Sequence, residues 1–539
     1  MSARLGRLPF CICVFILALT SLTMLGVAQV NVTTYHNDNA RTGQNLQETI
    51  LTTSNVNSTH FGKLFSQPVD GFIYAQPLYV SNVAIPDQGT HNVVYVTTMN
   101  DSVFAFDADS NGGSNQQALW QVTFTNPAAG ITTVSTTDVD CTVTVTSEIG
   151  IMATPVIDLS SNTLYVVART RESGTFYHRL HALDITTGAE KFGGPVAIQA
   201  TVSGTGSGSK GGKISFNAQL ENPRAGLLLQ NGLVYIAWSS LCDHGAYHGW
   251  VMAYDVQTLA QTAAWITTAN GKRGGIWQSG GGLAGDSSYN TFLAIGNGTF
   301  DADTAGSDYG QSITKLAPPS SGTFPVADYF TPYNAITYNS TDLDIGSGGV
   351  LLLPDQTIGP FAHLLAQGDK AGNLYLINRD NMGHFNSSNN NQIVQYIPGA
   401  DAGMYSSPTW WNNYVYISGK GNPIKAFSFN PTTGLISTTP SSQTGATYTY
   451  PGSTVSVSAN QATNGIVWAV NNATFANPSK NASLHAYDAT NLARQLYGSG
   501  QNPSRDNPGP AVKFTVPTIA NGKVYVATQK SLVVYGLLQ

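Results

Sequence analysis

One repeated pattern dominates this sequence: a short apolar strand after Pro or Gly, a second strand rich in Val and Tyr, a polar turn, and a third strand that ends near an Asp. The pattern occurs eight times, about once every 63 residues. The middle strands of the eight units are expected at residues 93–97, 163–167, 233–237, 291–295, 363–366, 414–417, 465–469 and 523–527. Short β-rich strands that recur between Gly, Asn and Asp turns predict the blades of a β-propeller rather than separate domains.

The expected fold is all-β: an eight-bladed β-propeller of four-stranded antiparallel blades. The last unit stops after three strands, and residues 62–68 precede the first unit without a blade of their own. We therefore expect residues 62–68 to pair with the C-terminal strand, which would close the ring and remove its open edges. A seven-bladed ring is left open, in case one irregular unit is not a blade. A stack of β-sandwiches is disfavoured, because sandwich strands would not recur in fours.

The composition fits a globular protein with unusually few charges. The chain has 539 residues, of which 42% are hydrophobic and only 10% are charged, with a net charge of -6. This apolar content is too high for a disordered chain, and the acidic balance argues against a general nucleic-acid binder. After the N-terminal stretch no run is apolar enough to span a bilayer, so we expect no membrane span in the mature chain.

The N-terminus has the pattern of a secretory signal peptide. Arg4 and Arg7 precede an apolar stretch at residues 8–25, and small residues follow where a signal peptidase would cleave. We therefore expect a signal peptide at residues 1–28, a lead segment at residues 29–60 and the propeller at residues 61–539. The protein would be exported, to the periplasm or the extracellular space, and an uncleaved anchor is the alternative.

Two cysteines remain in the expected mature chain, Cys141 and Cys242. An oxidising compartment would allow them to form a disulfide. The sequence does not show whether they are in contact, so their pairing is left open. Two thiols so far apart do not have the spacing of a zinc site.

Loop geometry predicts one central pocket. In a propeller, the loops that enter the first strand of each blade and the loops that join its second and third strands emerge on the same face. The chemically interesting residues in these loops are Asp243, His244, Trp277, Asn297, Asp344 and Lys370. We expect them to face one mouth. Each also has a structural interpretation, as a turn-capping carboxylate, a packed aromatic ring, a left-handed turn residue or a solvated cation.

Other polar residues favour a structural role. The aspartates that end successive third strands are expected to cap turns, because they follow the repeat: Asp107, Asp184, Asp255 and Asp488. His36 and Asp38 invite a catalytic interpretation, but we favour hydrogen bonds within the lead segment.

Several segments resemble a known family. They are residues 35–43, residues 274–277 with 294–298, residues 344–346, and residues 368–375, which read Gly-Asp-Lys-Ala-Gly-Asn-Leu-Tyr. These segments are similar to elements of the pyrroloquinoline quinone (PQQ)-dependent quinoprotein dehydrogenases, eight-bladed propellers that hold the cofactor and a calcium ion on the axis. The resemblance at the level of motifs is confined to about residues 240–380.

The resemblance implies a role for each pocket residue. Trp277 would be the floor on which the quinone stacks, and Lys370 and Asn297 would also bind the cofactor. Asp243, Asn297 and Asp344 would offer oxygen ligands to calcium. Asp344 would also be the catalytic base that takes the hydroxyl proton of an alcohol or a sugar. These residue types supply a π face, a carboxylate base, a fixed cation and hard oxygen ligands.

Some features depart from the family. No adjacent cysteines occur, and Glu148 lies where the family tends to have an Arg-Gly pair, so its carboxylate would face an anionic cofactor. Asp243 replaces an expected Glu. No Cys-x-x-Cys-His occurs, so electrons would leave to a separate acceptor.

Two functions therefore remain open. One is a PQQ- and calcium-dependent oxidoreductase acting on an alcohol or a sugar. The other is a non-catalytic propeller that binds a protein or glycan through loops that include Tyr405, Trp410 and Trp411.

Overall fold

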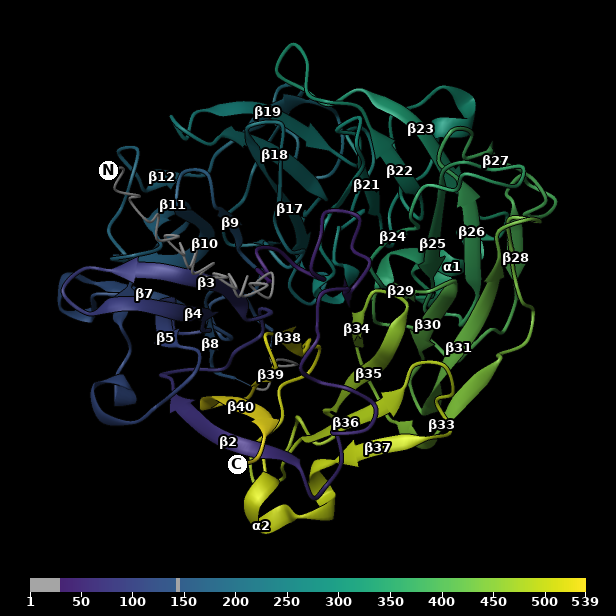
Figure 1. Cartoon of the computed structure of the whole chain (residues 1–539). Helices are drawn as coiled ribbons and strands as arrows, with labels where there is room; N and C mark the ends of the chain where they lie inside the picture. The colour runs from purple at the N-terminus through teal and green to yellow at the C-terminus, as the bar shows by residue number, and fades with distance from the viewer. Residues whose placement is uncertain (1–29, 142–145) are drawn as a thin grey trace, which may run out of the picture.

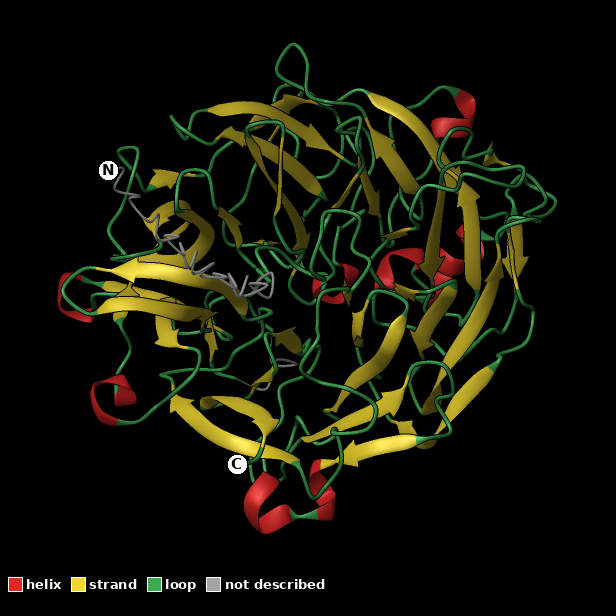
Figure 2. Ribbon diagram, in the orientation of Figure 1, coloured by secondary structure: helices red, strands yellow, loops and turns green. Residues whose placement is uncertain are grey.

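The computed structural model describes residues 30–141 and 146–539, and these residues form eight blades around one axis (Figure 1). Each blade has four antiparallel strands, and helices are few and short (Figure 2). The predicted eight-bladed, all-β propeller is confirmed, and the seven-bladed alternative is wrong. The predicted signal peptide at residues 1–28 lies outside the described residues.

The strands of each blade are given from the axis outward. Blades one to four are β3 (Leu78–Ile85), β4 (Gly89–Thr97), β5 (Ser102–Asp107), β6 (Trp120–Thr123); β9 (Val156–Asp158), β10 (Thr163–Glu172), β11 (Thr175–Asp184), β12 (Val196–Ala197); β16 (Leu228–Gln230), β17 (Leu233–Ser240), β18 (Trp250–Asp255), β19 (Gln261–Ile266); and β20 (Ala284–Gly285), β21 (Thr291–Ala294), β22 (Ile313–Leu316), β23 (Val326–Thr331). Blades five to eight are β24 (Leu351–Leu352), β25 (Leu364–Gly368), β26 (Leu374–Asn378), β28 (Gln395–Ile397); β29 (Thr409–Trp411), β30 (Tyr414–Ser418), β31 (Asn422–Asn430), β33 (Ser442–Tyr448); β34 (Ser456–Asn460), β35 (Thr463–Asn471), β36 (Ser483–Asp488), β37 (Gln495–Gly498); and β38 (Thr518–Ala520), β39 (Lys523–Ala527), β40 (Ser531–Leu537), β2 (Phe61–Pro68).

Short strands and helices occur in addition to the four strands of each blade. The extra strands are β1 (Gln44–Asn45), β7 (Ile131–Ser135), β8 (Glu148–Ile149), β13 (Thr201–Ser203), β14 (Lys213–Ser215), β15 (Glu221–Asn222), β27 (His384–Phe385) and β32 (Leu435–Ile436). The α-helices are α1 (Ala335–Thr341) and α2 (Pro503–Asp506). In the described part of the chain, no helix is long and apolar enough to cross a membrane.

The two ends of the propeller meet in the eighth blade. Strand β2 pairs antiparallel with β40, and the register joins Phe61 to Leu537 and Pro68 to Ser531. The predicted closure is therefore confirmed. It protects the outer edge of β40, which would otherwise expose unpaired backbone groups.

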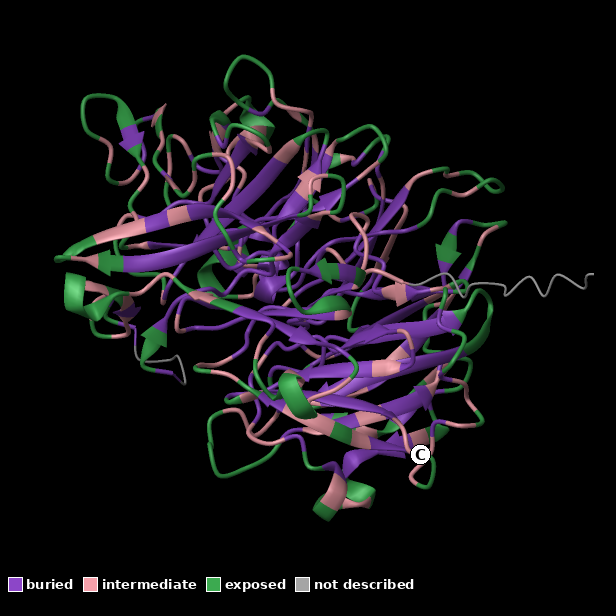
Figure 3. Ribbon diagram, turned by 60° about the vertical axis from the view of Figure 1, so that its left-hand side comes forward, coloured by how far each residue is buried: buried purple, intermediate pink, exposed green. Residues whose placement is uncertain are grey.

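The core is a ring of interfaces rather than one central mass. Eight clusters of buried apolar side chains each join two neighbouring blades. Strands are mostly buried, and exposed residues gather in the loops (Figure 3). The turn-capping aspartates are also as predicted, because Asp107, Asp184, Asp255 and Asp488 each accept backbone N–H groups of the turn that follows. Turns capped in this way are polar without many ionised side chains, in keeping with the 10% of charged residues in the sequence.

The lead segment contacts every blade. Figure 1 shows it in purple at the centre of the ring. Residues 32–45 bond to the innermost strands through the pairs Val32–Tyr79, Thr33–Ile157, Asn39–Leu229, Asn39–Gly285, Ala40–Leu352, Thr42–Trp410, Gly43–Val457 and Asn45–Ile519. The segment therefore links all eight blades at the axis.

Two buried side chains fix this segment. Arg41 is fully buried and donates to the carbonyl oxygens of Leu283 and Leu227, at 2.7 and 3.0 Å, and to oxygens of the lead segment itself. His36 bonds to the carbonyl oxygens of Arg41 and Val455, and burial lowers its pKa to about 4. His36 thus has the structural role that we favoured.

Candidate functional site

A cavity of about 470 Å³ lies on the axis, at the end of the ring where the innermost strands begin. Its lining includes Tyr74, Cys141, Met152, Asn222, Arg224, Cys242, Asp243, Tyr247, Trp277, Asn297, Asp342, Asp344, Lys370, Tyr405, Tyr450, Lys513 and Phe514, so that every blade contributes. Five of the six residues predicted to face one mouth are in this set: Asp243, Trp277, Asn297, Asp344 and Lys370. The pocket predicted from the two loop classes is therefore present. His244 does not line it, because its side chain turns toward Asp140, 3.8 Å away.

Asp344 and Lys370 belong to one polar network in the cavity. Lys370 Nζ lies 2.6 Å from Asp342 Oδ2 and 3.4 Å from Asp344 Oδ2. The backbone N–H of Asn297 donates to Asp344 Oδ1 at 2.8 Å, and its side-chain N–H donates to Asp342 Oδ1 at 2.9 Å. Asn297 Oδ1 accepts a 2.6 Å hydrogen bond from Gln311. Five residues from blades four and five and the connection between them are thus held in one arrangement.

The pKa values of both charged groups of the predicted chemistry are raised, that of Asp344 by burial and that of Lys370 by its carboxylate partners. Burial raises the pKa of Asp344 above its ordinary value, although the charge of Lys370 and the Asn297 N–H oppose this shift. Burial acts to lower the pKa of Lys370, but Asp342 and Asp344 outweigh it, so that the pKa of Lys370 is raised. Lys370 is therefore a fixed cation, and Asp344 is a carboxylate whose proton affinity is increased.

Trp277 belongs to four aromatic rings that contact one another edge to face, which we call the aromatic quartet: Trp277, Tyr405, Tyr450 and Phe514. The ring centroids lie 6.4 Å apart for Trp277–Tyr405, 5.1 Å for Tyr405–Tyr450, 6.3 Å for Tyr450–Phe514 and 5.4 Å for Phe514–Trp277. All four interplanar angles lie between 83° and 89°. No aromatic ring of the described residues stacks flat on Trp277, which suits a side chain that presents a face to a planar ligand.

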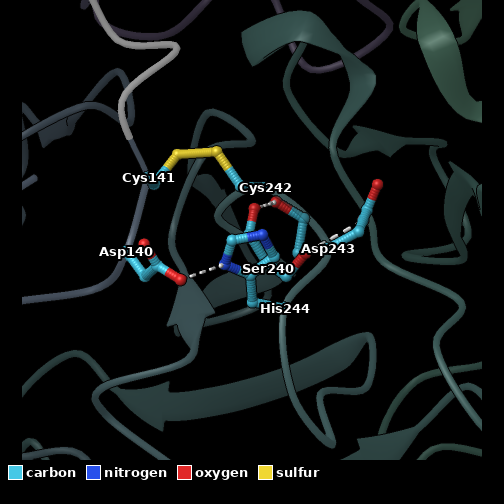
Figure 4. Close-up of a disulfide and its surroundings, with 7 residues drawn as sticks. Asp140, Cys141, Ser240, Cys242, Asp243 and His244 are labelled. Atoms are coloured by element: carbon cyan, nitrogen blue, oxygen red, sulfur yellow. Dashed lines mark hydrogen bonds and ion pairs between the residues drawn. A yellow bond between two sulfur atoms is a disulfide. The ribbon is translucent and has the colours of Figure 1, made fainter.

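Asp243 lies on a loop that a disulfide anchors (Figure 4). Cys141 and Cys242 are bonded, with Cα atoms 5.6 Å apart, so the pairing left open by the sequence does occur. Asp243 Oδ1 accepts hydrogen bonds from Tyr247, at 2.6 Å, and from Ser240, at 3.1 Å. The disulfide joins the connection between blades one and two to the third blade, so it forms one wall of the cavity.

The predicted metal ligands are only partly connected. Asn297 and Asp344 are in direct contact, but no hydrogen bond joins Asp243 to either of them. Among residues 30–141 and 146–539, no group of three or more His, Cys, Asp or Glu side chains could hold a metal ion. The oxygen donors are the chemical type that calcium prefers, but their present arrangement is held together by Tyr247, Ser240 and Gln311.

Three charged residues of the cavity were not among the predicted site residues: Asp342, Arg224 and Lys513. Asp342 lies two positions before Asp344, in the same connection. Arg224 and Lys513 lie in the connections that enter blades three and eight. Like Trp277, these three residues lie in connections that enter the first strand of a blade, so their place at the cavity follows from the same loop geometry.

Two other expectations about the site were wrong. Glu148 does not face the cavity, because it is exposed in β8 and bonds to Thr146 and Ser147. Trp410 and Trp411 do not lie in a binding loop, because they belong to the innermost strand β29 and are 5% and 1% exposed. Tyr405, in contrast, does line the cavity.

Comparisons with known proteins show a shared fold. No protein-family model matches the sequence, and no curated protein matches it. The quinohemoprotein alcohol dehydrogenase of Comamonas testosteroni is similar with a TM-score of 0.61 at 14% identity, over 95% of this chain and 81% of that one. A quinohemoprotein alcohol dehydrogenase of Pseudomonas putida has a TM-score of 0.59 at 13% identity, over 94% and 80% of the two chains. At this identity the likeness concerns the fold alone.

Proposed function

We propose that this chain is an exported quinoprotein-like dehydrogenase that binds PQQ and calcium in the axial cavity and oxidises an alcohol or a sugar. The observation that carries the proposal is the convergence of Trp277, Asn297, Asp344 and Lys370 on one cavity. These residues come from separate connections, and the family resemblance assigns each a role in the same pocket. The shared fold of the two alcohol dehydrogenases is in keeping with this proposal.

Each residue of the cavity would have a separate role in binding or in proton transfer. PQQ, when bound, would supply the two-electron oxidation of the substrate. Trp277 would support the planar ligand, and Lys370 would donate to one of its oxygens while Asp342 holds the amine in place. Asp344 would accept the hydroxyl proton, a role favoured by the burial that raises its pKa. Calcium would be held by oxygens of Asn297, Asp344 and Asp243.

Location and partners follow from the same chemistry. The disulfide between Cys141 and Cys242 supports an oxidising compartment, in line with the signal-like N-terminus. The substrate would be a small alcohol or sugar, and electrons would pass to a separate acceptor protein or small molecule. The net charge of -6 gives no reason to expect nucleic acid as a partner.

The decisive experiment separates ligand binding from turnover. The purified protein is titrated with PQQ in the presence of calcium, with Trp fluorescence as the readout, and dye-linked oxidation of alcohols and sugars is then measured. Asp344→Asn should bind PQQ and lose at least 100-fold in turnover, because the base is lost. The control Asp303→Asn changes the same charge on an exposed turn outside the cavity lining. Full turnover by Asp344→Asn would remove Asp344 from the mechanism.

A second candidate is a non-catalytic propeller that binds a protein or glycan. One observation favours it: Asn297, Lys370, Asp342 and Asp344 satisfy one another without any ligand. Absence of saturable PQQ binding in the experiment above would support this candidate and reject the dehydrogenase. A glycan array probed with the mature protein would then be the next measurement.

A further inference from the structure

The cavity contains two cations that have no anionic partner. Arg224 is 2% exposed, and Lys513 is half-buried. In the part of the chain that the structure describes, neither forms an ion pair with a carboxylate, in contrast to Lys370, which has two within 3.4 Å. A buried charge is costly unless something pairs with it.

Arg224 is oriented by its surroundings but not neutralised. Its guanidinium donates to the carbonyl oxygens of Met152, at 3.1 Å, and Ser279, at 2.9 Å, and lies 5.5 Å from the ring centroids of Tyr74 and Phe514. Burial raises the pKa of Tyr74 to about 12, so this phenol is uncharged at neutral pH. Arg224 therefore has dipoles and π faces around it, but no counter-charge.

Lys513 reaches the same region from the eighth blade. Its Nζ lies 5.6 Å from the ring of Phe514 and 5.2 Å from the ring of Phe475. Burial, and then the positive charge of Arg224, lower the pKa of Lys513 to about 8. The side chain remains protonated at neutral pH, so two positive charges act on each other inside one cavity.

The charges of the cavity are thus distributed on two sides of the aromatic quartet. Asp342, Asp344 and Lys370 act on Tyr405, whose pKa is raised mainly by burial. Arg224 and Lys513 lie against Phe514. One side holds two carboxylates with Lys370, whereas neither cation on the other side forms an ion pair with a carboxylate of the described residues. Asp243, which also lines the cavity, is held by Tyr247 and Ser240. A ligand that fits both sides would carry its negative charge beside Phe514.

We propose that Arg224 and Lys513 form the anion-binding end of the cavity and hold a carboxylate group of its ligand. The inference rests on the proposed function in taking this cavity as the ligand site. Within that function, the carboxylates of PQQ would be the groups held. An acidic substrate is the other source of the same chemistry.

The test measures binding without turnover. Wild type, Lys513→Met, Lys513→Arg and Lys420→Met are titrated by calorimetry at pH 7 with three probes: PQQ, benzene-1,3,5-tricarboxylate and its uncharged triamide. Lys420 is the matched control, because its Nζ lies 5.9 Å from the Tyr405 ring but the residue is exposed and does not line the cavity. Circular dichroism and thermal melting confirm that each variant is folded.

The expected result is a loss of about 10-fold to 100-fold in affinity for both acids in Lys513→Met, as for a charged hydrogen bond in a cavity. Lys513→Arg and Lys420→Met should bind like the wild type, and the triamide should bind weakly to all four proteins. Equal binding of PQQ by wild type and Lys513→Met would overturn the inference and leave the proposed function standing. Binding of the tricarboxylate that needs Lys513, without binding of PQQ, would reject the quinone and keep the anion site. Binding of neither acid would reject both.

Discussion

Replacing Lys513 with methionine should stabilise the ligand-free protein, although the same change should weaken ligand binding. The Lys513 ammonium packs near Phe475 and Phe514 and close to the charge of Arg224, without a carboxylate partner. Methionine has a similar length and can pack on the same rings without a charge that must be removed from water. The folded state would therefore lose an unfavourable electrostatic energy.

The size of this energy follows from the pKa of Lys513. Burial and Arg224 lower this pKa from the ordinary 10.5 to about 8, a difference of about 3 kcal/mol at neutral pH at ~1.4 kcal/mol per pH unit. Because part of the side chain is exposed, we expect a gain of about 1–3 kcal/mol. In the wild type, the unfolded chain keeps the Lys513 proton up to about pH 10.5, whereas the folded chain loses it near pH 8. The free energy of unfolding therefore rises with pH across this window, and the advantage of Lys513→Met declines across it.

Differential scanning calorimetry of wild type, Lys513→Met and Lys420→Met between pH 6.5 and pH 10 tests this reasoning. For one cooperative unit of this length, 1 kcal/mol changes Tm by about 1 °C. We expect Lys513→Met to melt about 1–3 °C above the wild type at pH 7, with a difference that shrinks toward pH 10, and Lys420→Met to match the wild type. A saturating carboxylate ligand should reduce or remove this difference in Tm, because it binds the wild type more tightly. A lower Tm for Lys513→Met at pH 7, or a difference that does not vary with pH, would refute the electrostatic account.

Two further predictions concern the ring itself. Phe61→Ala should destabilise the protein by about 3–5 kcal/mol in urea unfolding, because Phe61 is fully buried in β2 against Trp468, Tyr497 and Tyr535. The control Leu64→Ala changes a 37% exposed position of the same strand and should cost under about 1 kcal/mol. Equal effects of the two substitutions would contradict the role of β2 in closing the ring. Reduction of the Cys141–Cys242 disulfide, which joins positions 101 residues apart, should lower the unfolding free energy by about 2–4 kcal/mol. The double variant Cys141→Ser/Cys242→Ser should be insensitive to reductant, and an unchanged wild type after verified reduction would count against this prediction.

The repeat made the fold predictable from the sequence. Each unit carries its own strand pattern and turn-capping Asp, so the number of blades follows from local signals that recur eight times. The closure of the ring was predictable as well, because only residues 62–68 lacked a blade and only the last unit lacked a strand. Blade geometry then placed Trp277, Asn297 and Lys370 on one face.

The rest of the site depends on contacts that leave no local pattern. Arg224 and Lys513 are 289 positions apart in the numbering and meet only because blades three and eight both reach the axis. The disulfide likewise joins two irregular connections. Trp410 and Trp411 were misplaced for a related reason: adjacent tryptophans suggest a binding loop, whereas β29 is an innermost strand whose two faces both pack against neighbouring blades. The positions of side chains outside the repeat depend on how the whole ring closes, so they cannot be predicted from any one unit.

Ring closure and the shape of the axial cavity both depend on all eight blades. The lead segment bonds to the innermost strand of every blade, and every blade contributes to the cavity lining. The arrangement of Arg224, Lys513 and the aromatic quartet is therefore a property of the whole ring. A substitution that loosens the ring, such as Phe61→Ala, should lower stability and ligand affinity together. Lys513→Met should separate them, because it removes a charge that the ligand uses and the empty cavity does not. This divergence is the signature expected of a residue retained for binding rather than for folding.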